Sequence, residues 1–362
     1  MKIFSDTFSS YYRFRLLYLQ IVILTKAVNR SVTLIRNLNN MALKKAKIWK
    51  WWGKVFILAL LVVFVVRVFF VQSYTVSSSQ METALLRGEK VLVNKMAYGI
   101  RIPSTLLSIP FTFDSFFGMK SYSEALQLGY HRFFSSAISR NDVVIFNNPG
   151  ETDKPIDKRT LCISRCIAVP GDTISVQAGD MFINGKRYVA SPDLLLPYCF
   201  PLTSKDTVAG IMKSLHISAR NLQSDSLFVY SSQSRYEAFL INQKLTDSLQ
   251  LKLKTDDIYS YKLLVPSKGM LIKLTDDNKK LFAGIIKDES GIDVMSPEEK
   301  LLSYKFRYDY YWFLSDNTEN SIDSRTLGFI SEKYIVGKAS IIWYSPDNKG
   351  RGLTSLGMAF IK

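Results

Sequence analysis

Three consecutive serines, Ser77, Ser78 and Ser79, follow shortly after the long apolar stretch of the chain. A serine hydroxyl acts as a nucleophile when a neighbouring base takes its proton. A serine at this place would attack a substrate just outside a membrane, so the sequence raises the question of which residue is the base. The alternative is an ordinary polar loop, because serine is also a frequent turn residue.

The apolar stretch at residues 55–71, VFILALLVVFVVRVFFV, carries a single charge at Arg67. It is long enough to span a bilayer, and basic residues before a span favour the cytoplasmic side. A cleaved signal peptide is the alternative, but no small-residue cleavage site follows the stretch. We therefore predict one retained anchor at the inner (plasma) membrane, with the C-terminal part on the outer, periplasmic side. The lysines that favour this orientation are Lys44, Lys45, Lys47, Lys50 and Lys54.

The positive charge is concentrated at the N-terminus. The chain of 362 residues has a formal net charge of +16, and residues 1–54 hold eleven Lys or Arg and one acid, which is +10 of that total. The excess is thus not spread over the folded part, and no RNA-binding signature or zinc spacing is present. We expect no nucleic acid partner, no metal and no cofactor.

The first forty residues contain a short apolar segment, LLYLQIVIL, between basic residues. Two interpretations remain open for them. They form an amphipathic helix on the membrane surface, or they are a misassigned extension before a start at Met41.

The part after the anchor predicts mainly β structure. Runs rich in β-branched residues lie between turn residues, and Asn184-Gly185 predicts a tight hairpin turn. Residues 191–300 differ in composition and show helical spacing at 207–223 and 235–253. We expect one antiparallel β domain, residues 72–190 and 301–362, interrupted by a mixed α+β domain at 191–300. The predicted strands are 89–98, 141–149, 161–169, 173–188, 306–317 and 334–345.

The three cysteines, Cys162, Cys166 and Cys199, do not form a disulfide framework. Cys162 and Cys166 lie four residues apart in a predicted strand, too far for a bond to each other. One bond to Cys199 is conceivable, and three buried thiols are the simpler interpretation.

Several blocks, in this order, resemble the type I signal peptidases, membrane-anchored serine proteases that remove signal peptides from secreted proteins. The resemblance covers about residues 55–362, with 191–300 fitting a variable insertion. It implies a β-sheet catalytic domain beside the membrane. The blocks are VSSSQMETALLRGEKVLVNK, RNDVVIFNNP, ISRCIAVPGDTI, SDNTENSIDSRTLGFI and GKASIIWYS.

The resemblance assigns roles to single residues. It implies that Ser79 is the nucleophile and that the Ser77 hydroxyl helps the Ser79 N–H to stabilise the oxyanion. It implies that Ser321 orients the base. In the same block Asp323 and Arg325 would form a structural ion pair, with Asp316 in the neighbouring turn. The alternative is an ordinary charged loop on the surface.

The base itself breaks the pattern. Bacterial members have a lysine before the arginine of this block, and here that position is Ser164, whose hydroxyl cannot take a proton near neutral pH. Relatives in eukaryotes use histidine there, but His131 and His216 lie in poorly matched regions. Further departures are Gln80 for the usual methionine after the nucleophile, Glu82 for proline and Ser315 for glycine.

Two functions follow from this pattern. The chain is a signal peptidase with an unusual base, or it is an impaired paralogue that binds signal peptides or partners an active signal peptidase. Both interpretations predict secretory preproteins and the lipid bilayer as partners, and the second adds another signal peptidase.

Overall fold

The structure is a computed structural model of the 362-residue chain. It forms two compact units, residues 1–63 and residues 64–362. The prediction for residues 1–40 falls outside the described part, except for the helical residues 24–26. The described residues are 24–26, 45–105, 107–108, 115–116, 119–123, 125–177, 180–189, 194–254, 261–296, 298, 301–319, 321–346 and 359–361, with only the backbone described at 45–50, 115–116 and 359–360.

Helix α2, Lys45–Phe69, contains the predicted anchor. Its segment Trp51–Phe69 has a mean hydropathy of 2.3, and none of it is buried inside the protein. By length and composition this helix can cross a membrane. The helix stops at Phe69 and a strand begins at Val71, so the last two residues of the predicted span lie outside the helix.

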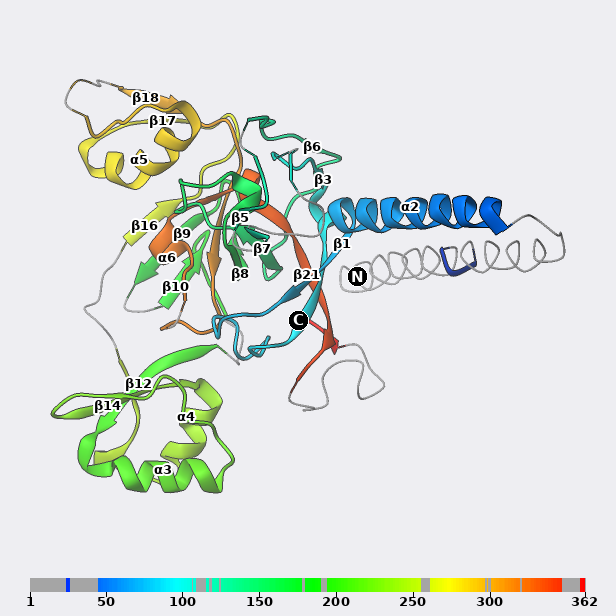
Figure 1. The fold of residues 1–362 in the computed structure, drawn as a ribbon. Helices are drawn as coiled ribbons and strands as arrows, with labels where there is room; N and C mark the ends of the chain where they lie inside the picture. The colour runs from blue at the N-terminus through cyan, green and yellow to red at the C-terminus, as the bar shows by residue number, and fades with distance from the viewer. Residues whose placement is uncertain are drawn as a thin grey trace, which may run out of the picture. The chain divides into compact units, whose positions relative to one another are not determined.

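The largest sheet has eight strands, in the order β1-β2-β21-β7-β8-β19-β20, with β22 paired to β21. All of its pairs are antiparallel (Figure 1). Side chains of alternate residues leave a strand on opposite faces, so the sheet supports a separate hydrophobic cluster on each side. The strands are β1 Val71–Thr75, β2 Lys90–Asn94, β7 Val143–Asn147, β8 Leu161–Ala168, β19 Tyr310–Leu314, β20 Ile330–Ser331, β21 Ile335–Tyr344 and β22 Ala359–Phe360.

A second antiparallel sheet has the order β11-β10-β9-β16. The hairpin between β10 and β11 turns at Asn184 and Gly185, whose φ angles of 52° and 76° suit a tight turn of the predicted kind. The Asn-Gly prediction is therefore confirmed. The strands are β9 Thr173–Gln177, β10 Asp180–Ile183, β11 Lys186–Arg187 and β16 Tyr261–Leu264.

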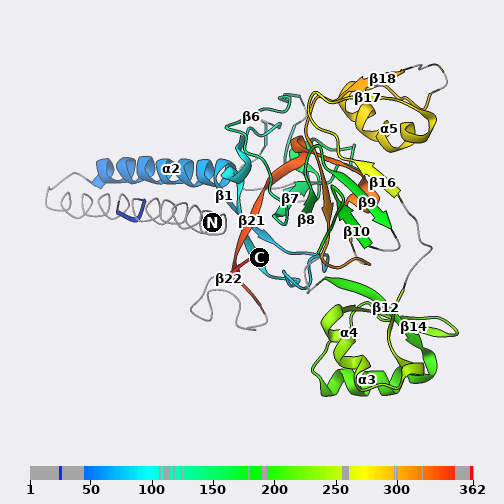
Figure 2. The ribbon, with the colours of Figure 1, turned by 180° about the vertical axis from the view of Figure 1, so that it is seen from behind.

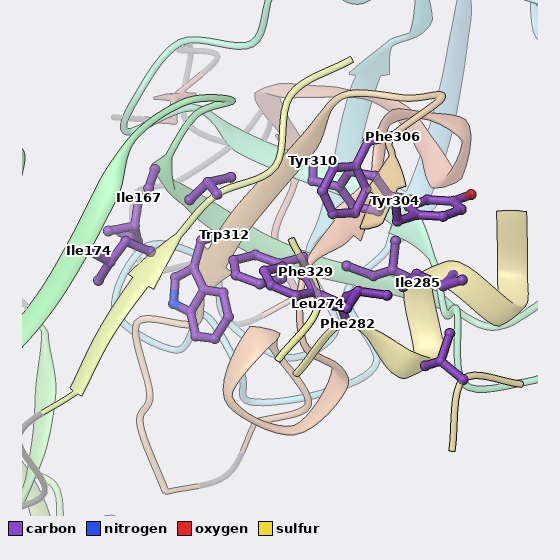
Figure 3. Close-up of a cluster of buried hydrophobic side chains, with 14 of the residues drawn as sticks. Ile167, Ile174, Leu274, Phe282, Ile285, Tyr304, Phe306, Tyr310, Trp312 and Phe329 are labelled. Atoms are coloured by element: carbon purple, nitrogen blue, oxygen red, sulfur yellow. The ribbon is translucent and has the colours of Figure 1, made fainter. Parts of the chain in front are cut away.

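Helix α5, Asp276–Ser290, packs against the β domain. Figure 3 shows its Phe282 and Ile285 in one cluster with Trp312 and Phe329. The strands β17, Leu271–Lys273, and β18, Ser303–Lys305, which precede and follow α5 in the chain, form an antiparallel pair. Part of the segment 191–300 thus shares a core with residues outside it, and its description as a separate domain stays a prediction.

Residues 194–254 form a group with a core of their own, which we call the inserted subdomain. Helices α3 and α4 pack with a four-stranded antiparallel sheet in the order β13-β14-β12-β15 (Figures 1 and 2). Helix α3 starts before its predicted range, 207–223, and ends inside it. Helix α4 starts at the first residue of its predicted range, 235–253, and also ends inside it. The elements are α3 Lys205–Ser214, α4 Arg235–Asn242, β12 Leu195–Pro201, β13 Gln223–Ser224, β14 Phe228–Ser234 and β15 Lys252–Leu253.

The described chain also contains further short strands and one short α-helix. They are β3 Ile100–Arg101 paired with β6 Arg132–Phe133, β4 Ser115–Phe116 paired with β5 Met119–Lys120, and α6 Ser324–Leu327. The predicted fold class is confirmed: the protein is mainly β, its sheets are antiparallel, and an apolar helix precedes them. Cys162 and Cys166 are buried free thiols, and Cys199 is a half-buried one.

Candidate active site

Ser164 lies in the middle of β8, between β7 and β19. Its side chain is completely buried. The hydroxyl donates to the Ile163 carbonyl at 2.7 Å and lies 3.0 Å from the Ser315 hydroxyl. The position where the resemblance expects a base therefore holds a small neutral group with neutral partners.

The serine triplet lies in a loop whose two ends are joined by backbone hydrogen bonds. Val76 donates to the Glu89 carbonyl, and Gly88 donates back to the Val76 carbonyl, each at 2.8 Å. Gly88 has a φ of 91°, which glycine adopts without strain. Ser77 is exposed and Ser79 half-buried, so the loop presents its serines near the surface.

The loop is fixed from below by apolar side chains. Met81 and Leu85 are fully buried in a cluster that also contains Ile163 of β8. The Glu82 N–H donates to the Ser79 carbonyl at 3.2 Å, which makes residues 79–82 a turn. We call residues 77–82 the serine turn.

The segment 315–317 connects the serine turn to Ser164. Its first residue, Ser315, bonds Ser164 through its hydroxyl, as described above. The Asp316 N–H points to the Met81 sulfur at 3.4 Å, and the Asn317 N–H donates to the Gln80 carbonyl at 2.8 Å. The Asn317 side-chain amide also donates to the Ser79 carbonyl at 3.3 Å. Segment 315–317 therefore contacts Ser164 through its first residue and the serine turn through the other two.

A buried ion pair holds this segment on β8. The Arg165 guanidinium donates to both carboxylate oxygens of Asp316, at 2.9 and 2.7 Å. The two side chains are only 8% and 5% exposed. A two-bond arginine–carboxylate contact fixes orientation as well as distance. Sequence reasoning placed Asp316 in a supporting turn but did not find Arg165 as its partner.

Asp323 anchors the end of the same loop. Its buried carboxylate accepts from the Ser315 N–H and from the guanidinium of Arg325, and it also accepts from the Ser321 hydroxyl at 3.1 Å. Burial by itself would raise the pKa of Asp323, but the hydrogen bonds and charge of Arg325, with the Ser315 N–H, outweigh burial and hold that pKa below its usual value. Asp323 and Arg325 thus pair as the resemblance implies, and the Ser321 hydroxyl takes part in that pair.

The lowered pKa of Asp323 predicts a dependence of stability on pH. A carboxyl group with a depressed folded-state pKa stabilises the fold above its unfolded pKa and loses that effect as pH falls through the folded value. The melting temperature of the wild type should therefore approach that of Asp323→Asn between about pH 5 and pH 2. Thermal melts of both proteins across this range provide the measurement. A constant difference down to the lowest pH would show that the pair does not hold the carboxylate ionised.

Lys158 and Lys95 bond groups outside the serine turn and Ser164. The Lys158 ammonium donates to the Ser108 hydroxyl at 2.7 Å. Burial lowers the pKa of Lys95 to about 8, but its ammonium donates to the carbonyls of Arg67 and Val68 at the end of α2. His131 and His216 are exposed, whereas Ser164 is completely buried.

Comparison with known proteins identifies the family. A family model described as "Signal peptidase, peptidase S26" matches residues 49–248 and 264–344. The chain belongs to the S26 signal peptidase family. "Signal peptidase I" of Buchnera aphidicola subsp. Acyrthosiphon pisum is 26% identical over 292 residues, which is 79% of this chain and 72% of the relative.

Two further relatives are more distant or shorter matches. "Signal peptidase I" of Rickettsia bellii strain OSU 85-389 is 22% identical over 81% of this chain and 72% of its own length. "Signal peptidase I P" of Bacillus subtilis subsp. natto is 29% identical over 38% of this chain and 51% of its own length. The family model matches parts of the inserted segment as well as the β domain.

Gln80 and Met81 follow the candidate nucleophile Ser79 in the chain, and both are buried. Gln80 is 8% exposed, and the fully buried Met81 packs with Leu85 and Ile163. The resemblance implies a methionine directly after the nucleophile, and this chain has Gln80 after Ser79, with Met81 one residue later. The same resemblance expects the base at the position of Ser164.

Proposed function

We propose that this S26 family member binds the signal peptides of secretory preproteins beside the membrane and that its own cleavage of them is slow or absent. The observation that carries this proposal is the Ser164 hydroxyl, which is buried against the Ser315 hydroxyl. Loss of a general base typically reduces the rate by about 10²–10⁴.

Within this proposal, Ser79 remains the candidate nucleophile. Its N–H and the Ser77 hydroxyl are the candidate oxyanion donors. Ser321 would orient an amine at position 164, as the resemblance implies. Its hydroxyl bonds Asp323 and accepts from Arg325 at 2.7 Å, which supports a fixed position for this group.

A second candidate is an active signal peptidase with a base from another segment. The retained Ser77, Ser79 and Ser321 favour it, together with the names of the relatives. The two candidates differ in one property. An active enzyme cleaves signal peptides in a reaction that requires Ser79, and an impaired paralogue retains only their binding. As an impaired paralogue, the chain has an active signal peptidase as a candidate partner.

Signal-peptide binding is the property that both candidates share. A fluorescent signal peptide should bind the purified full chain in detergent micelles saturably. An unlabelled signal peptide should compete with it, and a version with charged residues at positions −1 and −3 should compete poorly. Binding that is absent, or equally competed by the charged version, would reject the proposal in both forms.

We also propose that the β domain lies on the outer face of the inner membrane. The lysines before Trp51 and the apolar helix α2 support this orientation through the positive-inside rule. Protease added to intact spheroplasts should degrade the domain while a cytoplasmic marker survives. Protection of both the domain and the marker would show that the domain is cytoplasmic.

A further inference from the structure

The inserted subdomain contacts the serine turn through Arg220 and Asn221. These two residues precede β13, and we call them the 220–221 corner. The Ser232 N–H and the Ser231 hydroxyl of β14 both donate to the Arg220 carbonyl, at 3.0 and 3.3 Å. The corner is therefore held rigidly on the sheet of the subdomain.

Asn221 reaches the site through Asn317. Its side-chain amide donates to the Asn317 oxygen at 3.1 Å and to the Ser232 hydroxyl at 3.0 Å. The orientation of the Asn317 amide is determined by its surroundings, because its nitrogen faces two acceptors, the Ser79 carbonyl and a Glu82 carboxylate oxygen. Its oxygen must then face Asn221, which acts as the donor. The completely buried Asn317 thus connects the corner to the serine turn.

Arg220 makes a second connection to the same turn. Its guanidinium bonds both carboxylate oxygens of Glu237 in α4, at 3.0 and 2.9 Å, and lies 3.8 Å from a carboxylate oxygen of Glu82. The side chains of Arg220, Glu82 and Glu237 are 20%, 29% and 19% exposed. Partial burial reduces screening by water, so one cation holds an acid of the subdomain and an acid of the serine turn together.

The backbone adds a third connection at the start of β12. The Leu195 N–H donates to the Asp316 carbonyl at 2.8 Å, and its carbonyl accepts from the Thr318 hydroxyl at 2.9 Å. Segment 316–318 is therefore bonded to the serine turn and to the subdomain. The subdomain and the turn share one hydrogen-bonded network rather than a simple surface contact.

We propose that the 220–221 corner is a positioning element of the serine turn, through which the inserted subdomain fixes the geometry of the site. Arg220 and Asn221 touch no reacting atom in this account and act through Glu82 and Asn317. This positioning does not depend on whether the site cleaves its ligand. Its test therefore measures the turn directly, and not catalysis.

Hydrogen–deuterium exchange of the full chain in micelles provides that test. The reporters are the amides of Glu82, Leu85 and Asn317, which are hydrogen-bonded within or onto the turn. Asn221 has a φ of 49°, so Asn221→Gly keeps the left-handed backbone and removes only the side-chain amide. We expect protection of the reporters to fall at least about tenfold, since an opening turn exchanges through local unfolding.

Arg220→Met and Arg235→Met form a matched pair of variants. Both remove an arginine from the same subdomain, but Arg235 is exposed on α4 and Arg220 lies beside Glu82. Arg220→Met should reduce protection of the turn, and Arg235→Met should leave it unchanged. If Asn221→Gly fails to fold, the comparison of Arg220→Met with Arg235→Met tests the proposal by the same loss of protection in the serine turn.

A double substitution separates positioning from a general loss of stability. In an Asn317→Ala background the link to Asn221 is already broken, so Asn221→Gly should have no further effect on the turn. If instead lost protection in Asn221→Gly and Arg220→Met is confined to β14 and α4, the corner stabilises only its own subdomain and the proposal is wrong. If the losses of protection caused by Asn317→Ala and Asn221→Gly add up in the double variant, the proposal is also wrong.

Discussion

Replacing Ser164 by lysine and Ser315 by glycine together should raise signal-peptide cleavage by at least about 10². The lysine would place an amine where the resemblance to type I signal peptidases expects the base. Burial at this position would favour the neutral amine, which is the form that takes a proton from a serine. Ser164 is completely buried, so this effect should be large.

The second substitution follows from the contact between the two hydroxyls. The Ser315 oxygen lies 3.0 Å from the Ser164 oxygen, directly beside the space into which a longer side chain must extend. Glycine at 315 removes this obstacle, and the Ser315 N–H that bonds Asp323 is retained. We therefore expect Ser164→Lys alone to give a smaller gain than the double variant.

Controls connect the gain to the proposed chemistry. Ser164→Met with Ser315→Gly has a side chain of similar length without an amine and should gain nothing. Ser79→Ala in the lysine-containing double variant should abolish the gain. A gain that survives Ser79→Ala would show that another group is the nucleophile.

Replacing Arg165 by methionine should lower the free energy of unfolding by about 3–5 kcal/mol. The substitution leaves the Asp316 carboxylate, which is only 5% exposed, without its two charge-assisted hydrogen bonds. A buried ion pair adds little net stability as a whole, but removing one partner strands the other charge. The measurement is denaturant unfolding of the full chain in micelles, followed by its intrinsic fluorescence.

An exposed pair of the same type is the control. Arg187 and Asp180 lie 2.8 Å apart, but their side chains are 60% and 41% exposed. Arg187→Met should lower the free energy of unfolding by no more than about 1 kcal/mol, since water screens an exposed ion pair and can replace its contacts. Equal costs for Arg165→Met and Arg187→Met would mean that the Arg165–Asp316 pair is accessible to water.

Local sequence signals predicted several strands of the β domain, but the predicted strand 89–98 ended too late, because residues 95–98 form a 3-10 helix. The Asn184-Gly185 turn forms where expected because positive φ angles at both residues select this dipeptide. Buried strands such as β7 and β8 were evident from their β-branched runs. These features depend on neighbouring residues only, and a single sequence contains that information.

Contacts between distant segments were not predictable in the same way. Nothing near Ser164 in the sequence indicates that Ser315, 151 residues away, is its hydrogen-bond partner. Helix α5 shares a core with Trp312 and Phe329, although the composition of residues 191–300 suggested a separate domain. Arg220 and Asn221 carry no local motif at all, and only the fold brings them to Glu82 and Asn317.

The most direct test of the central claim is the single-turnover cleavage of a signal-peptide substrate by the purified wild type and by Ser79→Ala, at enzyme concentrations that saturate binding. We expect both proteins to bind the substrate and to cleave it at equally low rates, because no base activates Ser79. Rapid cleavage by the wild type that disappears in Ser79→Ala would contradict the account, and would show that a residue other than Ser164 takes the proton.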